Sequence, residues 1–173
     1  MIGSNDVRVD IAVTGNAWMG DGTRSISSVI ESMLQNANNE IMIVAYAITE
    51  AVDDFIKQIC DCLYRGIKVI LIINRLTEQP IKIQDEILRM LKEFQHFFVF
   101  NFNPPNFKES LHAKVLVVDR SIALIGSSNL SWRGLVKNHE LAVTIQGPSV
   151  GLISELVDCL IKDHRTLQVK YDV

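Results

Sequence analysis

The chain has 173 residues, of which 48% are hydrophobic and 21% are charged, and it carries a formal net charge of −3 at pH 7. This balance is typical of a globular protein with a sizeable core and excludes a disordered chain. No apolar run approaches the roughly 20 residues of a membrane-spanning helix, and the acidic total excludes a chain that attracts nucleic acid through its overall charge.

Segments with strand periodicity alternate with segments of helical periodicity through the first hundred residues. The expected elements are, in chain order, a strand (7–15), a helix (23–37), a strand (40–48), a helix (50–66), a strand (67–73), a helix (81–95) and a strand (96–102). Thr23 stands where the first helix would be capped, and Gly66 stands where the second would end.

The remaining expected elements are a strand (110–119), a strand (121–127), a strand (139–146) and a closing helix (148–167). A tight turn at Asp119–Ser121 joins the first two of these strands. Strands that are apolar on both faces and alternate with helices indicate an α/β layered fold. We therefore predict a mixed, mainly parallel β-sheet sandwiched between helices, in a single domain over residues 1–173.

The three cysteines are Cys60, Cys62 and Cys159, and none of them forms a C-x-x-C pair. This count and spacing argue against a disulfide framework or a zinc site, and we expect buried free thiols in a reducing cytoplasm. The N-terminal residues lack the basic start and apolar run of a secretory signal, which also favours a cytoplasmic location.

Positive charge is concentrated in one part of the chain. Residues 101–140 carry five basic and three acidic side chains, whereas residues 1–100 carry nine basic and thirteen acidic ones. A local positive site on an acidic body favours an anionic substrate held at one point. It is less typical of a long groove that follows a phosphate backbone.

The stretch LHAKVLVVDRSIALIGSSNL, residues 111–130, carries polar groups at the mouth of a predicted strand. His112 and Lys114 are two residues apart, so on a strand they share one face. Burial of a lysine is costly unless it has a partner or meets an anion. The pair therefore indicates a binding site for an anion.

More polar residues follow the next strand, where Gly126 lets a ligand approach the backbone closely. Ser127 and Asn129 share a parity if the chain stays extended, and Glu140 opens the strand after that. These residues predict a site in which an imidazole, an ammonium, a carboxamide and a carboxylate converge.

These four groups suit the chemistry of a phosphodiester. A lysine and an asparagine amide can donate hydrogen bonds to phosphoryl oxygens. A carboxylate can accept a hydrogen bond from one imidazole nitrogen, fix its tautomer and leave the other nitrogen free to attack. Because Lys114 supplies the fixed positive charge that a cation would otherwise supply, we expect no metal and no cofactor.

The spacing resembles the HKD signature of the phospholipase D superfamily. The matching residues are His112, Lys114, Asp119, Gly126, Ser127, Asn129 and Glu140. The segments EIMIVAYAIT and RGIKVILIIN are similar to earlier strands of that family. The run GSSNLSWRGLVKNHE resembles its single-motif, nuclease-like branch more than its lipid branch.

The resemblance implies a role for each matching residue. These roles are nucleophile and carrier of a phosphohistidine (His112), phosphoryl binding (Lys114, Asn129 and Ser127), orientation of the nucleophile (Glu140) and structural support (Asp119 and Gly126). Enzymes of this family use two such motifs in each active site, and this chain has one. The resemblance therefore implies a homodimer with a shared site.

We predict a cytoplasmic, metal-independent phosphodiesterase, specifically a nuclease whose partner is nucleic acid, with DNA favoured over RNA, and which does not act at a membrane. The first alternative is a lipid-acting phospholipase D. The second is a non-catalytic module that binds nucleic acid or mediates assembly within a larger helicase or defence protein.

Several residues beside the predicted site have two interpretations. Trp18 and Trp132 can stack a nucleic-acid base, although packing is the commoner role of a tryptophan. Arg133 and Lys137 can contact phosphates or belong to a solvated loop. His139 alternates with its neighbour on the last strand and is expected to face away from the site.

Overall fold

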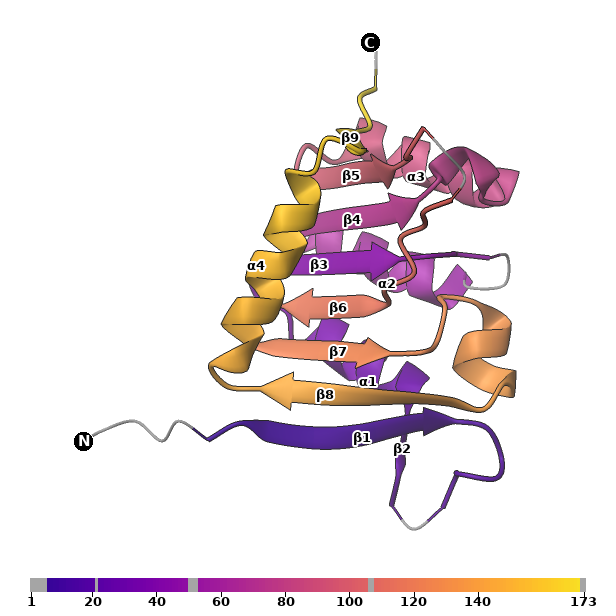
Figure 1. Ribbon diagram of the computed structural model, residues 1–173, viewed down its shortest axis with the longest axis vertical. Coiled ribbons are helices and arrows are strands. Elements are labelled where there is room, and N and C mark those ends of the chain that lie inside the picture. The colour runs from indigo at the N-terminus through magenta and orange to yellow at the C-terminus, as the bar shows by residue number, and fades with distance from the viewer. Residues whose placement is uncertain (1–5, 21, 50–52, 106–107, 172–173) are drawn as a thin grey trace, which may run out of the picture.

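The computed structural model describes residues 6–20, 22–49, 53–105 and 108–171, and the strands in these ranges form one nine-stranded sheet (Figure 1). The strands lie in the order β2-β1-β8-β7-β6-β3-β4-β5-β9. Their bounds are β1 Arg8–Thr14, β2 Arg24–Ser25, β3 Glu40–Ala45, β4 Lys68–Asn74, β5 Phe97–Phe102, β6 Val115–Val118, β7 Ile122–Gly126, β8 Glu140–Gln146 and β9 Thr166–Gln168.

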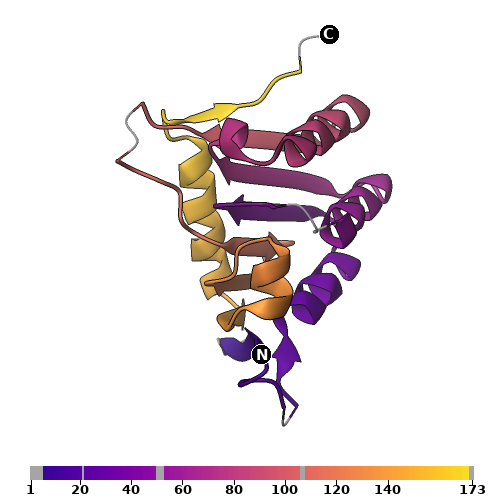
Figure 2. The same ribbon diagram turned by 90° about the vertical axis from the view of Figure 1, so that its right-hand side faces the viewer.

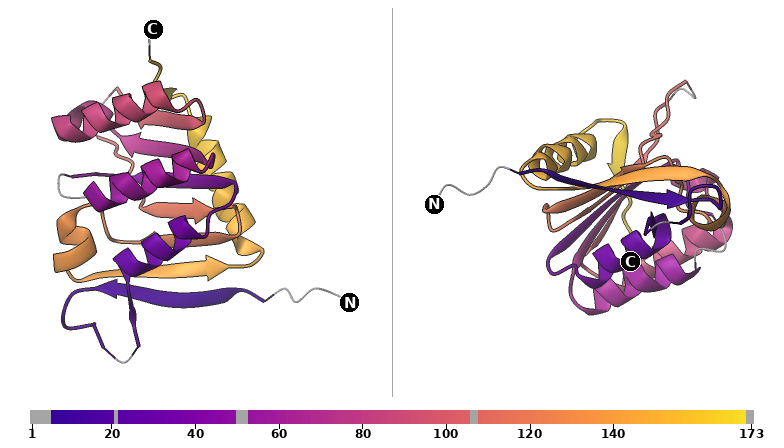
Figure 3. Two further views of the ribbon diagram at one scale, coloured as in Figure 1. Left: turned by 180° about the vertical axis from the view of Figure 1, so that it is seen from behind. Right: turned by 90° about the horizontal axis from the view of Figure 1, so that it is seen from below.

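Helices cover both faces of this sheet. They are α1 Ile26–Gln35, α2 Asp53–Tyr64, α3 Ile81–Glu93 and α4 Ser149–Ile161, with short helical segments η1 Leu76–Glu78 and η2 Arg133–Lys137. α1, α2 and α3 pack on one face, where Ile30, Ile59 and Ile87 are buried, and α4 crosses the other face, where it buries Val150 and Val157 (Figure 3). The predicted α/β fold with helices flanking a mixed sheet is confirmed.

The expectation that the sheet is mainly parallel is wrong. Among the described strands, three neighbouring pairs are parallel (β1–β2, β3–β4 and β4–β5) and five are antiparallel. The parallel pairs β3–β4 and β4–β5 come from helical crossovers, whereas β6, β7 and β8 follow each other with short returns or the η2 segment between them. A connection without a long crossover can only join antiparallel neighbours.

The predicted turn between β6 and β7 is confirmed. Val118 pairs with Ile122, and the N–H of Ser121 donates to the carbonyl of Val118 at 3.0 Å. Asp119 and Arg120 both have positive φ, of 51° and 49°, as the hairpin turn of this handedness requires.

The strand expected over 110–119 is shorter than predicted, because β6 begins only at Val115. Before it, the backbone N–H of Leu111 donates to the side-chain oxygen of Asn74 at 2.9 Å and the Leu111 side chain packs into the core under α4. This anchor holds residues 109–113 near the end of β4 and outside the sheet ladder, which begins where the Lys114 carbonyl accepts from the N–H of Gly126 at 3.3 Å. His112 and Lys114 therefore precede the strand.

Helix ends and thiols also differ in part from expectation. Ser25 and not Thr23 caps α1. The strand β2 includes Ser25, and the Ser25 hydroxyl accepts from the N–H of Ser28 at 3.1 Å.

The end of α2 is as predicted, because Gly66 follows this helix with a φ of 80°. The residues 50–52 that were expected to begin the helix lie outside the described residues. Cys62 is buried, but Cys159 is exposed on the outer side of α4.

The residues of the predicted site other than Asp119 lie at one edge of the sheet, which is formed by strand ends. β1, β3 and β7 end at this edge, and β6 and β8 begin there, because the latter two run antiparallel to their neighbours. Figure 2 shows the molecule from this edge, with the loops after β3, β7 and β1 brought together. Residues far apart in the sequence therefore meet.

Candidate active site

His112 and Lys114 lie together at this edge. The Lys114 ammonium nitrogen is 2.9 Å from His112 Nδ1 and 3.2 Å from Nε2, and it donates to the His112 carbonyl at 2.7 Å. The His112 side chain is exposed and Lys114 is half-buried. The structure therefore brings the two residues into contact, as their spacing predicted, although they precede the strand.

Tyr46 completes this cluster and was missed by the sequence analysis. It follows β3 directly, and its ring centroid lies 4.6 Å from that of His112. The Lys114 ammonium is 5.2 Å from the Tyr46 ring centroid, within the range of a cation–π contact. An aromatic residue at the end of a buried strand that reaches the same edge was the available signal.

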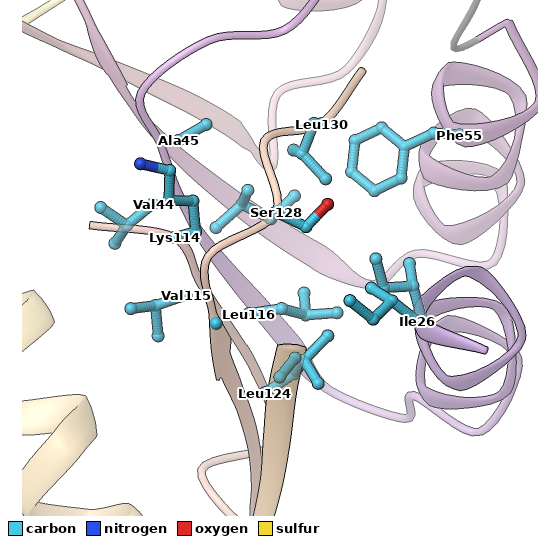
Figure 4. A pocket seen from close by; sticks show the side chains of 14 residues that line it. Ile26, Val44, Ala45, Phe55, Lys114, Val115, Leu116, Leu124, Ser128 and Leu130 are labelled. Carbon is cyan, nitrogen blue, oxygen red and sulfur yellow. The ribbon is translucent and has the colours of Figure 1, made fainter. Parts of the chain in front are cut away.

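A small apolar cavity lies behind the lysine. Figure 4 shows side chains from the sheet, from α1 and from α2 around it, with Lys114 at one side and Ser128 at another. Its volume of about 40 Å³ is room for about one water molecule. Burial against this lining lowers the pKa of Lys114, and the charge of Glu140 opposes that shift only in part.

Glu140 and Ser127 form a second polar cluster beside the first. The Ser127 hydroxyl donates to one Glu140 oxygen, and the Asn138 amide donates to the other at 3.1 Å. The N–H of Leu141 donates to the Ser127 hydroxyl oxygen at 3.3 Å. Within the described part of one chain, Glu140 contacts these residues and not His112, so its role in orienting the histidine stays a prediction.

Asn129 lies in the loop that follows β7. The N–H of Thr49 donates to the carbonyl of Leu130 at 3.1 Å, which ties this loop to the end of β3. The Asn129 side-chain oxygen is buried and has no hydrogen-bond partner among the described residues. A buried amide oxygen is costly unless a donor satisfies it. Because this oxygen can only accept, the donation to phosphoryl oxygens that the sequence predicts for Asn129 falls to its amide nitrogen and stays a prediction.

Asp119 lies at the opposite end of β6, away from His112. Its carboxylate accepts from the backbone N–H groups of Asn38, Asn39 and Glu40 at 2.8 to 2.9 Å. Burial is the largest single influence on the pKa of Asp119 and raises it, but these three donors together outweigh burial and lower it. The carboxylate thus joins the β6–β7 turn to the start of β3, the supporting position that its predicted role requires.

Gly126 ends β7 where the sheet is tightly spaced. A Cβ at this position would lie 2.5 Å from Ala142 Cβ and 2.8 Å from the carbonyl oxygen of Leu141. Only a residue without a side chain allows β7 and β8 to approach so closely. Gly126 thereby places Ser127 within reach of Glu140.

The flank of the site is formed by η2 and by the loop after β1. The His139 ring packs edge-on against Trp18 at 5.5 Å, and its Nε2 accepts from the N–H of Ala17 at 3.4 Å. Arg133 and Lys137 line an open groove of about 570 Å³ together with His139 and Glu140.

Trp132, at the other side of η2, lies 5.5 Å from the Lys137 ammonium. It also lines a separate groove between α1 and α2. Within the described residues, no group of three histidine, cysteine or carboxylate side chains is placed to hold a metal ion.

An imidazole, a lysine and a carboxylate thus lie at one edge of the sheet, and a comparison with family models agrees with this arrangement. The family model described as cardiolipin synthase, PLD-like domain, matches residues 30–163. The chain belongs to this phospholipase D-like family. The matched range contains every residue of the predicted site, and the resemblance drawn from the HKD spacing is confirmed.

Curated relatives give a narrower comparison. The DISARM protein DrmC of Bacillus paralicheniformis is 29% identical over 141 residues, which are 82% of this chain and 58% of that protein. Cardiolipin synthase A of Buchnera aphidicola subsp. Baizongia pistaciae is 31% identical over 102 residues, which are 57% of this chain and 20% of that protein. The chain thus spans only part of the length of these relatives.

Solved structures agree on the fold. Nuc from Salmonella typhimurium, a phospholipase D family member, superposes with a TM-score of 0.76 at 18% identity, over 96% of this chain and 100% of that one. TrmBL2, an archaeal chromatin protein with a novel mode of DNA binding, gives 0.64 at 17% identity, over 94% and 55%. No helix among the described residues is long and apolar enough to cross a membrane.

Proposed function

We propose that this chain is a metal-independent nuclease that cleaves phosphodiester bonds through a phosphohistidine, in a site shared between two copies. The observation that carries the proposal is the contact between exposed His112 and half-buried Lys114 at an open sheet edge. Family membership supports a phosphodiesterase-type enzyme. The nuclease likeness of the fold and the polar lining of the site favour nucleic acid as the substrate.

The first chemical step exchanges one bond to phosphorus for another. A ring nitrogen of His112 forms an N–P bond while the P–O bond to the leaving strand breaks. His112 of the partner subunit donates the proton that the leaving oxygen takes up. Lys114 and the Asn129 amide donate to the phosphoryl oxygens, whose charge increases in the transition state.

The second step returns both histidines to their starting state. Water attacks phosphorus, gives its proton to the partner's His112, and the N–P bond breaks. Hydrolysis of a phosphodiester requires about 20 kcal/mol or more of transition-state stabilisation. Proximity supplies about 7–11 kcal/mol and acid–base catalysis about 3–5 kcal/mol, so electrostatic donors supply much of the rest.

Cleavage of labelled single- and double-stranded DNA and RNA in EDTA tests the proposal. We expect the wild type to cleave at least one of these, DNA above RNA, and His112→Ala to lose at least ~10³-fold in rate. His164→Ala, at a side chain that is 89% exposed just before the edge strand β9, is the control and keeps its activity. Cleavage that needs added magnesium contradicts the assignment of Lys114.

A lipid phosphodiesterase is the second candidate, because the matching family and one relative carry the name cardiolipin synthase. A phosphatidyl substrate assayed beside the nucleic acids separates the two.

The remaining alternative is a non-catalytic module. Such a module would keep its binding function in His112→Ala, whereas the enzyme would lose turnover.

A further inference from the structure

The segment that carries His112 is held in place by contacts with distant parts of the chain. Residues 109–113 form no helix or strand, so they have no regular hydrogen bonding of their own. The N–H of Leu111, the residue before His112, donates to Asn74 Oδ1 at 2.9 Å. The Tyr46 ring lies against the imidazole, with 4.6 Å between the ring centroids. The position of the imidazole therefore depends on the positions of Asn74 and Tyr46.

One buried amide, the side chain of Gln79, joins these two residues. Its Nε2 donates to the carbonyl of Asn74 at 2.8 Å and to the carbonyl of Tyr46 at 3.3 Å. Its Oε1 accepts from the N–H of Ile48 at 3.0 Å. Gln79 is only 9% exposed, and a buried amide is costly unless its donors and its acceptor are paired, as they are here.

The hydrogen bond to Ile48 extends this network to the loop that carries Asn129. Ile48 forms an isolated parallel bridge with Leu130, the residue after Asn129. The N–H of Thr49 donates to the carbonyl of Leu130 at 3.1 Å. The amide of Gln79 thus connects the three segments that carry the Tyr46, His112 and Asn129 side chains of the candidate site.

The turn after β4 brings Gln79 to this place. Arg75 has a positive φ of 45°, and η1 follows it, so that Gln79 comes directly after this short helix. The turn has its own support from β5, because the N–H of Leu76 donates to Asn101 Oδ1 at 2.9 Å. Asn101 therefore holds the same turn as Gln79 but makes this contact on the side of β5, away from Tyr46 and Asn74.

We propose that Gln79 is a positioning residue for His112. Its amide fixes Tyr46 and Asn74 relative to each other, and these two residues fix the imidazole beside Lys114. This inference rests on the proposed function for its effect on catalysis, but not for its effect on the position of the ring. Because a displacement of about 1 Å in a reacting group can cost ~10²-fold in rate, a residue that touches no substrate can still govern turnover.

Two variants of matched design test this role. Gln79→Met and Asn101→Leu each replace an amide by an apolar side chain of similar size, so each removes hydrogen bonds without a large change of volume. Circular dichroism and urea unfolding check the fold and the stability of both. Cleavage in EDTA gives kcat and KM at a temperature at which all proteins are folded. Nuclear magnetic resonance of histidine-labelled protein reports the His112 ring, whose signals are assigned by their absence in His112→Ala.

We expect Gln79→Met to lower kcat by ~10–10²-fold and to change KM by less than about threefold, because the nucleophile and not the binding of substrate is disturbed. Its His112 ring signals should also shift, since the imidazole moves relative to the aromatic ring of Tyr46. Asn101→Leu should keep kcat within about twofold and leave these signals in place, even if it is equally destabilised. A folded Gln79→Met with the kcat and ring signals of the wild type overturns the proposal, as does an Asn101→Leu that reproduces its effects.

Hydrogen exchange in the wild type decides the question if Gln79→Met does not fold. The N–H groups of Ile48 and Leu111 both end in the network of Gln79, so they should exchange at least ~10³-fold more slowly than unstructured amides. Fast exchange of either group overturns the proposal. A wild type that cleaves no nucleic acid contradicts the proposed function, whereas the ring signals and exchange rates still test the role of Gln79.

Discussion

The environment of Lys114 links the candidate site to pH. Burial disfavours the charged form of an amine, so the pKa of Lys114 lies below its ordinary value of 10.5. The lysine is protonated below its pKa and loses its charge as pH rises through it. The ammonium that would hold the phosphoryl group is therefore lost at lower pH than a solvated lysine would lose it.

This shift predicts an alkaline limb in the pH profile of kcat/KM, which reports the free enzyme. As the pH is raised, we expect the activity in EDTA to begin to decline at a pH below the ordinary lysine pKa of 10.5. Lys114→Arg should move the limb to higher pH, because arginine stays charged throughout this range. Lys137→Arg, on the flank of the site, is the control. A limb that stays in place in Lys114→Arg would mean that another group titrates.

Asp119 gives a second prediction at the residue scale, for stability. Asp119→Asn should lower the free energy of unfolding at pH 7 by about 1–2 kcal/mol, because the three backbone donors lose a charged acceptor that is only partly shielded from water. Asparagine tolerates the positive φ of this position, so the turn itself is retained. Asp10→Asn, in an exposed ion pair, is the control.

The sign of the pH dependence follows from the lowered pKa of Asp119. Its stabilising contribution is present above the unfolded pKa of about 3.9 and is lost as pH falls through the folded value. Urea unfolding at several pH values should show the wild type and Asp119→Asn converging below about pH 4. A difference that persists in acid would show that packing and not charge is responsible.

Side-chain chemistry was the most predictable part of this site. His112 and Lys114 are in contact, as their two-residue spacing predicted, although they precede β6. Ser127 meets Glu140 because Ser127 follows β7 and Glu140 opens β8, its antiparallel neighbour. Tyr46 was not predicted, since an aromatic residue after a buried strand is ordinary in a sequence without its spatial neighbours. The burial of the Asn129 side-chain oxygen without a hydrogen-bond partner among the described residues could also be seen only in the structure.

Two glycines test how closely elements are spaced. Gly126→Ala should lower the free energy of unfolding by about 1–3 kcal/mol and reduce activity, because its Cβ meets the backbone and side chain of β8. Gly151→Ala is the matched control in α4, where a Cβ meets nothing within 4 Å. It should raise stability by about 0.5–1 kcal/mol through helix propensity.

Thermal or urea unfolding of both variants measures these effects, with cleavage assays on the same preparations. A Gly126→Ala protein that keeps wild-type stability would show that β7 and β8 can separate without cost. A loss of activity in Gly151→Ala would show that the assay responds to α4 rather than to the site.

Elements were predicted well where they are long and periodic. Helices α1 to α4 were expected from their apolar spacing, and Gly66 marked the end of α2. The strands β2 and β9 have two and three residues, too few to show any period. β6 was predicted too long, because the hydrogen bond between Leu111 and Asn74 that ends its pairing joins segments distant in sequence.

At the scale of the whole molecule, the sequence indicates layers better than strand directions. Apolar strands alternating with amphipathic helices require a covered sheet, and that was confirmed. The direction of each strand depends on how the chain returns, and after β6 it returns by a hairpin and by η2 instead of by a long helix. The single domain over 1–173 and the cytoplasmic location stay predictions.

The shared site predicts how activity depends on protein concentration. Among the described residues of one chain, His112 is the imidazole in contact with Lys114, and this group cannot carry the phosphoryl group and protonate the leaving oxygen at once. A monomer should therefore be inactive, while each dimer is active. Below the dissociation constant of the dimer, a tenfold dilution should lower the activity per chain by about tenfold, as mass action requires.

Cleavage rates in EDTA check this dependence when they are measured from nanomolar to high micromolar chain concentration, with the mass determined at the same concentrations by analytical ultracentrifugation. The rate per chain should be constant where the mass is that of a dimer and should fall together with it. Adding an excess of catalytically dead His112→Ala chains at low enzyme concentration should lower the rate further, because mixed dimers lack one imidazole. A rate per chain that stays constant where the mass is that of a monomer would remove the partner's histidine from the mechanism and leave a single-chain route to hydrolysis.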